Sequence, residues 1–292
     1  MDAKNFIRTD LAIERRRADT GIEGVTYTEK TQGEVVCGTL TVESEKGARE
    51  IGQPIGRYVT LKSKPFSKQT EDELSCEASL LASVLKEFCQ KAPSHVLVAG
   101  LGNRALTVDA IGPLAASRTV ATAHLAELEP ELFSSLDCSK ISVLSPGVLS
   151  ETGMESAELI KNAVKIAKPD LVILIDAFAA RSKERLASTV QISDTGLCPG
   201  AGVGNHRMLI DKETLGVPVL VIGVPTVIDT ATLIFDTLSA GESRDIPEDM
   251  MESLTSLQGL FVCVRECDAV TENAARLIAE GINRAFGIAH SM

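Results

Sequence analysis

Two aspartates, Asp109 and Asp176, lie at or after the end of apolar runs that are typical of buried strands. Asp176 ends the run 171–176, and Asp109 follows the run 96–101 after a short glycine-containing turn. In open α/β sheets, catalytic groups gather outside the carboxyl ends of the strands. Two carboxyl groups brought together there can share one proton, which is the chemistry of acid–base hydrolysis. The pair therefore predicts a hydrolase with Asp109 and Asp176 as its catalytic residues.

Each aspartate also fits a purely structural role, because Asp is a common N-cap of helices. Asp109 precedes a helical pattern that begins at Ala110, and Asp176 precedes the segment 177–180, which could form a helix. Capping explains either residue taken singly. Two aspartates at matched positions, together with a glycine-dense loop, favour a catalytic pair.

The glycine-dense loop follows an alternating, strand-like segment that begins at Thr189. Its glycines include Gly196, Gly200, Gly202 and Gly204. Fixing so many glycines costs conformational entropy, and binding residues are often carried on loops. We expect this loop to line the site, by contacting the substrate or by offering backbone N–H groups to a developing oxyanion.

From about residue 70 onward, strand-like and helix-like segments alternate. This pattern predicts an α/β fold with a mostly parallel sheet flanked by helices on both faces. The expected strands are 96–101, 140–144, 171–175, 217–224 and 260–264, and the expected helices are 70–91, 111–128, 156–167 and 270–286.

The N-terminal part of the chain has a different sequence pattern. Short β-type stretches predict a small β-rich subdomain at about 30–65, built around a hairpin. Residues 1–20 are polar and charged, and their composition favours a tail laid on the surface. We expect 21–292 to form a single α/β catalytic domain that includes the β-rich subdomain.

The composition of the 292 residues argues against several classes of protein. A formal net charge of −11 disfavours direct binding to nucleic acid or to an anionic membrane, since both need basic patches. The chain has no apolar run near the ~20 residues of a membrane span and no signal-peptide core. Its seven cysteines lack zinc-ligand spacing and indicate thiols in a reducing compartment. We expect a cytoplasmic protein with no metal or other cofactor.

Other catalytic motifs have weaker support. The turn Gly-Leu-Gly-Asn at 100–103 resembles a dinucleotide-binding turn, but no acidic residue closes a second strand where the ribose would need it. The serine-nucleophile elbow Gly-x-Ser-x-Gly is missing from the sequence. Two alternatives stay open. One is metal-assisted hydrolysis with the same aspartates and His124 or His206 as ligands, and the other is a non-enzymatic nucleotide-binding module.

Several motifs, which together cover nearly the whole chain, resemble the germination protease (spore protease) family. They are Arg-Thr-Asp-Leu-Ala at 8–12, Gly-Leu-Gly-Asn at 100–103, Thr-Val-Asp-Ala-Ile-Gly-Pro at 107–113, Ser-Pro-Gly-Val at 145–148, Ile-Asp-Ala-Phe-Ala-Ala-Arg-Ser at 175–182, the glycine loop at 191–207, Thr-Leu-Gly-Val-Pro at 214–218 and Ile-Gly-Val-Pro-Thr-Val at 222–227.

The resemblance implies an atypical aspartic endopeptidase that degrades small acid-soluble spore proteins in the spore core when germination begins. It also implies a homotetramer, made as a zymogen that removes a short N-terminal pro-segment by self-cleavage, with the junction in the region of Ile7 and Arg8. The implied fold is that of the hydrogenase-maturing endopeptidases with an added β-rich subdomain. The family's two essential aspartates fall on Asp109 and Asp176.

The chain departs from the family pattern at a few positions. Val108 and Ile111 replace the usual Pro and Leu around the first aspartate. In the glycine loop, Cys198 and Ala201 stand where the family commonly has His and Ser, which argues against an essential role for either. Only residues 1–7 precede Arg8, so we expect a short pro-segment or a different cleavage position.

Overall fold

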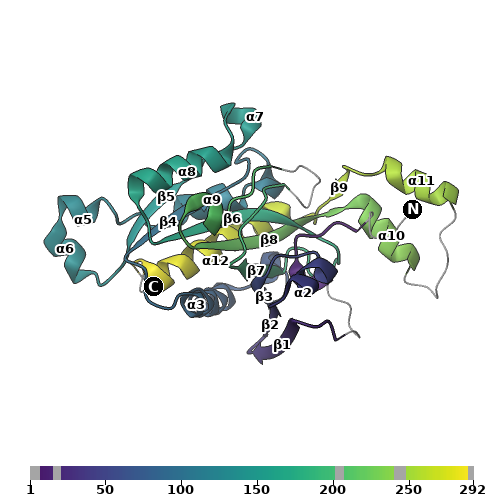
Figure 1. Cartoon of the computed structure of the whole chain (residues 1–292), viewed down its shortest axis with the longest axis horizontal. Helices are drawn as coiled ribbons and strands as arrows, with labels where there is room; N and C mark the ends of the chain where they lie inside the picture. The colour runs from purple at the N-terminus through teal and green to yellow at the C-terminus, as the bar shows by residue number, and fades with distance from the viewer. Residues whose placement is uncertain (1–6, 16–20, 201–206, 240–247, 289–292) are drawn as a thin grey trace.

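The structure is a computed structural model that describes residues 7–15, 21–200, 207–239 and 248–288 (Figure 1). The strands form one nine-stranded sheet in the order β1-β2-β3-β7-β8-β6-β4-β5, with β9 pairing to β8. The strand bounds are β1 Val25–Gln32, β2 Val35–Val42, β3 Gly56–Lys62, β4 His95–Gly100, β5 Lys140–Leu144, β6 Leu171–Ala180, β7 Thr189–Ser193, β8 Val219–Asp229 and β9 Phe261–Val262.

The parallel part of the sheet consists of β8, β6, β4 and β5. Strand β6 reads as an almost unbroken apolar run because it is buried along nearly its whole length. Parallel strands of this kind need cover on both faces of the sheet. The prediction of an α/β fold flanked by helices is therefore confirmed.

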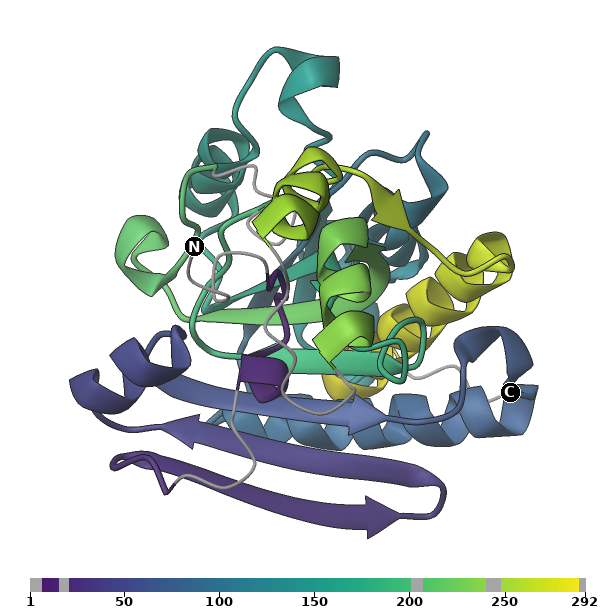
Figure 2. The ribbon, with the colours of Figure 1, turned by 90° about the vertical axis from the view of Figure 1, so that its right-hand side faces the viewer.

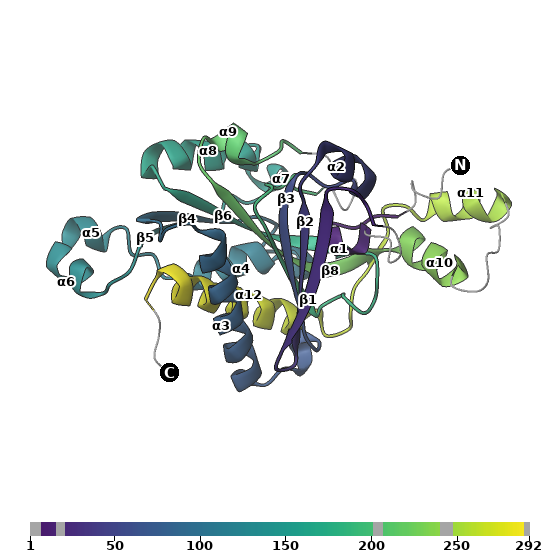
Figure 3. The same ribbon diagram turned by 60° about the horizontal axis from the view of Figure 1, so that its bottom comes forward.

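The β-rich segment continues the same sheet in the antiparallel sense (Figure 2 and Figure 3). The sheet is therefore mixed, where the sequence predicted a mostly parallel one. The physical reason lies in the short connection 181–188 between β6 and β7. A parallel crossover needs a dozen or more residues, so β7 instead runs antiparallel beside β8, and β3 joins it.

The helices cover the sheet from both sides. The bounds of the helices are α1 Ala12–Arg15, α2 Glu45–Ile51, α3 Glu71–Phe88, α4 Ile111–Arg118, α5 Leu125–Leu128, α6 Pro130–Ser135, α7 Leu149–Thr152, α8 Ser156–Ala167, α9 Lys212–Leu215, α10 Thr230–Ser239, α11 Glu248–Ser256 and α12 Cys267–Phe286, with short 3₁₀ turns η2 at Phe66–Lys68 and η3 at Thr107–Asp109. None of the described helices is both long and apolar enough to cross a membrane.

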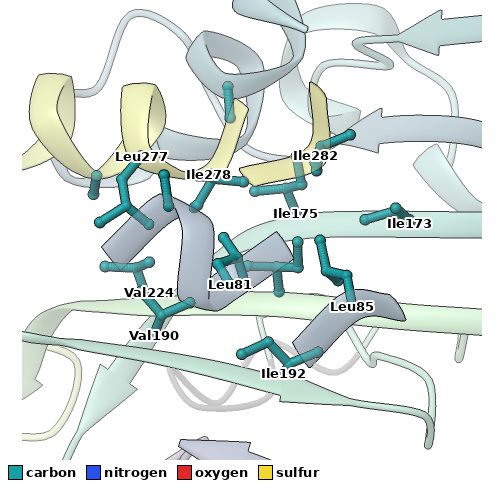
Figure 4. Packing of buried hydrophobic residues seen from close by; sticks show 14 of the residues in the cluster. Leu81, Leu85, Ile173, Ile175, Val190, Ile192, Val224, Leu277, Ile278 and Ile282 are labelled. Carbon is teal, nitrogen blue, oxygen red and sulfur yellow. The ribbon is translucent and has the colours of Figure 1, made fainter. Parts of the chain in front are cut away.

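Two apolar layers follow from the alternation of side chains along β6. Ile173 and Ile175 belong to the layer that also contains α3, α4 and α12, and Figure 4 shows Leu81 and Leu85 of α3 in this layer. Val172 and its alternate neighbours pack in a second layer with α8. The sheet thus has a filled core on each side, which fixes the positions of its strand ends.

One predicted helix ends early. The pattern predicts a helix over 111–128, but α4 stops at Arg118 and α5 begins at Leu125. Between them, Thr122 bonds to the start of β5: its N–H donates to Ile141 O at 3.0 Å, and its Oγ1 accepts from Ile141 N at 2.8 Å. These bonds to the strand replace the helical bonds.

The N-terminal segment 7–15 is packed into the protein, so the prediction of a surface-laid tail is wrong for these residues. Leu11 and Ala12 have no exposed surface, and Leu11 belongs to the apolar layer beneath α8. Asp10 N donates to Ala179 O at 2.9 Å, and Ala12 N donates to Gln191 Oε1 at 2.8 Å. Burial of two apolar side chains outweighs the charge of the surrounding sequence.

Two glycines allow α4 to approach the sheet closely. A Cβ on Gly100 would lie 2.0 Å from Gly112 O, and a Cβ on Gly112 would lie 2.1 Å from Leu101 O and 2.6 Å from Ile175 O. Only glycine fits these positions without a shift of the backbone. The contact places the start of α4, and the turn that precedes it, against the end of β4 and the middle of β6.

We expect Gly112→Ala to lower the free energy of unfolding by about 1–3 kcal/mol, because the added methyl group meets backbone atoms that cannot rotate away. Chemical denaturation measures this change. Gly21→Ala is the control, since a Cβ at Gly21 meets nothing within 4 Å. Equal stability of the two variants would show that the helix and the strands tolerate a wider separation.

Candidate active site

Asp109 and Asp176 line one cavity of about 330 Å³. The cavity lies where β4 and β6 meet the turn η3, and its wall also includes Asp10, Gly200 and Arg207. Asp109 comes from η3, and Asp176 comes from β6. The sequence-based expectation that these two carboxyl groups lie in one site agrees with this geometry.

Neither aspartate caps a helix. The N-cap of α4 is Ala110, and Asp109 Oδ2 instead accepts a hydrogen bond from Asn103 N at 2.7 Å. Asp176 lies inside β6, which continues to Ala180, so no helix follows it. The capping alternative is therefore wrong for both residues, and both side chains are available to the cavity.

The glycine turn after β4 serves Asp109 rather than a phosphate group. Gly102 has a φ of +110°, and a Cβ there would lie 2.1 Å from Asp109 O. The amide of Asn103, which a phosphate would need, already donates to the Asp109 carboxylate. The described geometry therefore gives no support to the nucleotide-binding alternative.

The two carboxyl groups differ in their electrostatics. Asp176 is only 6% exposed, and burial, the charge of Asp109 and the charge of Asp10 raise the pKa of Asp176 well above its ordinary value. Burial also raises the pKa of Asp109, but the hydrogen bond from Asn103 N acts in the opposite direction by stabilising the carboxylate. The pKa of each carboxyl group is thus raised, and that of Asp176 is raised further, which favours Asp176 as the protonated member of the pair.

Asp10 is a third carboxyl group at this site, and the sequence analysis missed it as a site residue. Its Oδ2 accepts from Ala179 N at 2.8 Å, while its own N–H donates to Ala179 O at 2.9 Å, so its side chain and its backbone together attach it to the end of β6. Glu14 fixes the segment further by accepting from Arg181 N at 2.7 Å and Ser182 N at 2.9 Å. Asp10 follows no strand, so only its place in the family-like motif 8–12 could have drawn attention to it.

Of the four glycines predicted to line the site, two lie within the described residues. Gly200 is part of its wall, Gly196 is not, and Gly202 and Gly204 lie outside the described residues. Gly196 has a φ of +82° and packs against the backbone of Ile210 and Asp211, which gives it a structural role.

The predicted junction of the pro-segment lies beside α10. Ile7 packs against the small apolar cluster of Phe235 and Leu254. Arg8 N donates to Thr232 Oγ1 at 3.1 Å. Both residues are therefore attached to the folded protein and connect directly to Asp10 in the cavity.

Three further side chains in the wall were not predicted as site residues. Arg207 Nη1 lies 3.4 Å from Glu155 Oε1 across the rim, and both residues line the cavity. Thr226 Oγ1 donates to Val108 O at 2.6 Å, which attaches η3 to β8. Arg207 and Thr226 belong to segments that resemble the family, but none of the three residues is close to Asp109 or Asp176 in the sequence, so only the fold brings them to the site.

Metal ligands are not assembled in the described part of the chain, where no group of three or more His, Cys, Asp or Glu residues could hold an ion. His124 is outside the cavity wall, and His206 lies outside the described residues. The described residues therefore lend no support to the metal-assisted alternative.

The raised pKa of Asp176 makes stability depend on pH. Because this pKa is higher in the folded state than in the unfolded chain, the folded state binds more protons between the two values. Raising the pH through this window therefore lowers the free energy of unfolding. We expect Asp176→Asn to be more stable than the wild type at neutral pH, with a difference that shrinks as the pH falls towards about 4.

Urea unfolding over this pH range measures the difference. The exposed Asp268 provides the matched control, because Asp268→Asn makes the same chemical change outside the cavity. A difference between Asp176→Asn and the wild type that does not vary with pH would contradict the raised pKa.

Comparison with known proteins identifies the family of the chain. Residues 1–241 match the family model for germination protease. The chain is 41% identical to the germination protease of Caldanaerobacter subterraneus subsp. tengcongensis over 96% of this chain and 94% of that one. It is 40% identical to that of Bacillus cytotoxicus over 97% and 94% of the two chains. It is 38% identical to that of Clostridium perfringens (strain ATCC 13124) over 96% and 95%.

Among solved structures, the chain aligns with the [NiFe] hydrogenase maturation protease HycI from Thermococcus kodakarensis KOD1, with a TM-score of 0.38 and 22% identity over 68% of this chain and 99% of that one. The chain belongs to the germination protease family and is a spore-germination endopeptidase.

Proposed function

We propose that this endopeptidase is of the aspartic type and that Asp109 and Asp176 carry its chemistry. The observation that supports the proposal most strongly is the single cavity in which the charge of Asp109 raises the pKa of Asp176. Such a pair holds one carboxyl group protonated and the other ionised at the same pH, and acid–base hydrolysis needs both forms at once.

The different environments of the two groups assign their roles. Asp109 is the general base, because the hydrogen bond from Asn103 N favours its carboxylate. It takes a proton from a water molecule, and the oxygen of this water attacks the peptide carbonyl carbon. Asp176 is the general acid, because burial keeps it protonated. It polarises the carbonyl oxygen and then protonates the leaving amine, which breaks the C–N bond.

After cleavage, Asp109 holds the proton taken from water and Asp176 is ionised. Transfer of one proton from Asp109 back to Asp176 restores the starting state of the pair. We propose that the backbone N–H of Gly200, which lies in the cavity wall, contributes to binding of the oxyanion.

The substrates that we propose are small acid-soluble spore proteins, degraded in the spore core at germination. Membership of the family supports this proposal. We also infer a homotetramer without direct contact to nucleic acid or membrane, and the formal net charge of −11 is consistent with the absence of those two contacts.

We further propose that the chain is a zymogen that cleaves itself near its N-terminus, in the region of Ile7 and Arg8. The path of the N-terminal segment supports this idea, because Asp10 lies in the wall of the cavity and pairs with Ala179 of β6. A segment in this place competes with a substrate chain for the same strand, in the manner of β-strand addition.

Replacing either aspartate tests the catalytic pair. We expect Asp109→Asn and Asp176→Asn each to lower the rate of cleavage of a purified small acid-soluble spore protein by at least about 10²-fold, because each removes one proton-transfer group. Gel-based cleavage assays measure the rates, and Asp268→Asn again serves as the control. Turnover at the wild-type rate by either site variant would disprove the assignment.

The same assay separates this mechanism from a metal-assisted one. Prolonged dialysis of the wild-type protein against a strong chelator leaves the cleavage rate unchanged if two carboxyl groups suffice. Loss of activity that Zn²⁺ or Mn²⁺ restores would favour metal-assisted hydrolysis instead.

Self-cleavage has its own test. We expect the full-length protein to lose a short N-terminal peptide on incubation, whereas full-length Asp176→Asn keeps its mass, because the same carboxyl pair does the cutting. Mass spectrometry over time measures both. A wild-type protein that cleaves a spore protein while its own mass stays constant would contradict the zymogen proposal and leave the peptidase assignment intact.

A further inference from the structure

Strand β8 contains a β-bulge at Thr226, in the wall of the cavity that holds the two aspartates. Phe178 of β6 pairs with Pro225, and the next residue of β6, Ala179, pairs with Val227. Thr226 is therefore an extra residue between two paired positions of β8. Bulges are uncommon between parallel strands, and beside active sites they often redirect a side chain. The bulge thus indicates that the direction of the Thr226 side chain matters at this site.

The bulge changes which face of the sheet the side chains of β8 point to. Before it, Ile222 and Val224 pack in the apolar layer that contains α4 and α12. After it, Ile228 packs in the opposite layer, although strict alternation would place it in the first. Thr226 lies at this change of face and is buried, and its Oγ1 donates to Val108 O of η3 at 2.6 Å. The extra residue therefore directs one hydroxyl group to the turn that carries the first aspartate.

The peptide unit that receives this bond is the one directly before Asp109. Its oxygen, Val108 O, accepts from Thr226, and its nitrogen, Asp109 N, donates to Leu106 O at 2.8 Å. Because a peptide unit is planar, bonds at both ends fix the orientation of the plane. The turn η3 is only three residues long, and the side chain of its N-cap, Leu106, has no polar atom to cap it. The backbone position of Asp109 therefore depends on bonds from outside η3.

A second bond attaches the start of η3 to a helix. Thr271 of α12 is buried, and its Oγ1 donates to Thr107 O at 3.0 Å. The bond from Thr226 differs in two respects, because it reaches the peptide unit next to the aspartate and comes from the cavity wall. Its strand also pairs directly with β6 at Asp176, which lies opposite Gly223. Thr226 thus connects the backbone of one catalytic residue to the strand beside the other.

We propose that Thr226 is a positioning residue, whose hydroxyl group holds Asp109 at its place relative to Asp176 by bonding to Val108 O. This inference rests on the catalytic roles proposed above for the two aspartates. Like charges on the two carboxyl groups repel each other and push η3 away from β6, and the bond from Thr226 opposes that movement. A displacement of about 1 Å between reacting groups can lower a rate by about 10²-fold.

Steady-state cleavage of a purified small acid-soluble spore protein by the full-length protein tests the role. Thr226→Val removes the hydroxyl group, and we expect it to lower kcat by at least about tenfold because Asp109 moves. We expect KM to change by less than about threefold, because the hydroxyl group bonds to the protein itself. Thr226→Ser keeps the hydroxyl group, and its kcat should stay within about threefold of the wild type.

Two further variants separate the role from a general loss of stability. Thr119→Val is the matched control, since Thr119 is buried outside the cavity wall and its Oγ1 donates to Ala115 O at 2.9 Å. It loses a bond of the same kind, and we expect it to keep the wild-type kcat. Thr226→Ala removes the hydroxyl group without placing a methyl group against Val108 O, so it covers the case in which Thr226→Val does not fold. Urea unfolding confirms that each variant is folded under the assay conditions.

Titration of the Asp176 carboxyl carbon by NMR gives a readout that a merely structural role would not change. If Asp109 moves away in Thr226→Ala, its charge raises the pKa of Asp176 less, so this pKa falls below the wild-type value. Thr119→Val should leave the pKa of Asp176 at the wild-type value.

The outcomes separate this inference from the proposed catalytic pair. Wild-type kcat and an unchanged pKa of Asp176 in Thr226→Ala, with Asp109→Asn and Asp176→Asn inactive, would overturn the positioning role and leave the pair intact. A loss of kcat in Thr226→Ser as large as that in Thr226→Val would also overturn it, because the hydroxyl group is then not the cause. Cleavage at the wild-type rate by the two Asn variants would reject the pair itself, and the positioning role with it.

Discussion

Electrostatic repulsion between carboxyl groups enclosed in one cavity is the constraint on which the site depends. Asp176 is buried beside Asp109 and Asp10, so its ionised form lacks water and faces two like charges. The pKa of Asp176 is raised further than that of Asp109, whose carboxylate receives the amide of Asn103, so Asp176 is the favoured holder of a shared proton. One site then holds an acid and a base together, which two isolated aspartates in water cannot do at any single pH near neutrality.

The packing around the sheet holds Asp109 and Asp176 close together. The apolar layers on its two faces fix β4 and β6, and the contact of Gly100 with Gly112 removes the space that would separate η3 from β6. Thr226 attaches η3 to the neighbouring strand β8. The aspartates are thus held by elements that are rigid for reasons of packing, and the energetic cost of burying Asp176 is met by the stability of the whole core.

Much of this could be predicted from the sequence, because the relevant signals are local. The apolar run that ends at Asp176 predicts a buried strand, and Thr70 followed by Glu73 forms the capping box that starts α3. The early end of α4 could not be predicted in this way, since it depends on Thr122 bonding to a strand that comes later in the chain.

The same limit applies to the site. Asp109 and Asp176 could be predicted because each is placed by its own strand or turn. Asp10 could not, since nothing in its local sequence reveals that Leu11 is buried beneath α8 or that Ala179 offers a partner. The mixed sheet could not be predicted for a related reason. The direction of a strand depends on which neighbouring strand its connection can reach, and this is a property of the whole fold.

The most direct test is to titrate the carboxyl carbons of Asp109 and Asp176 by NMR in the wild type and in Asp109→Asn. We predict that Asp176 in the wild type has a pKa well above that of an ordinary aspartate, and that this pKa falls when the charge of Asp109 is removed. An ordinary pKa for Asp176, or one that Asp109→Asn leaves unchanged, would contradict the account.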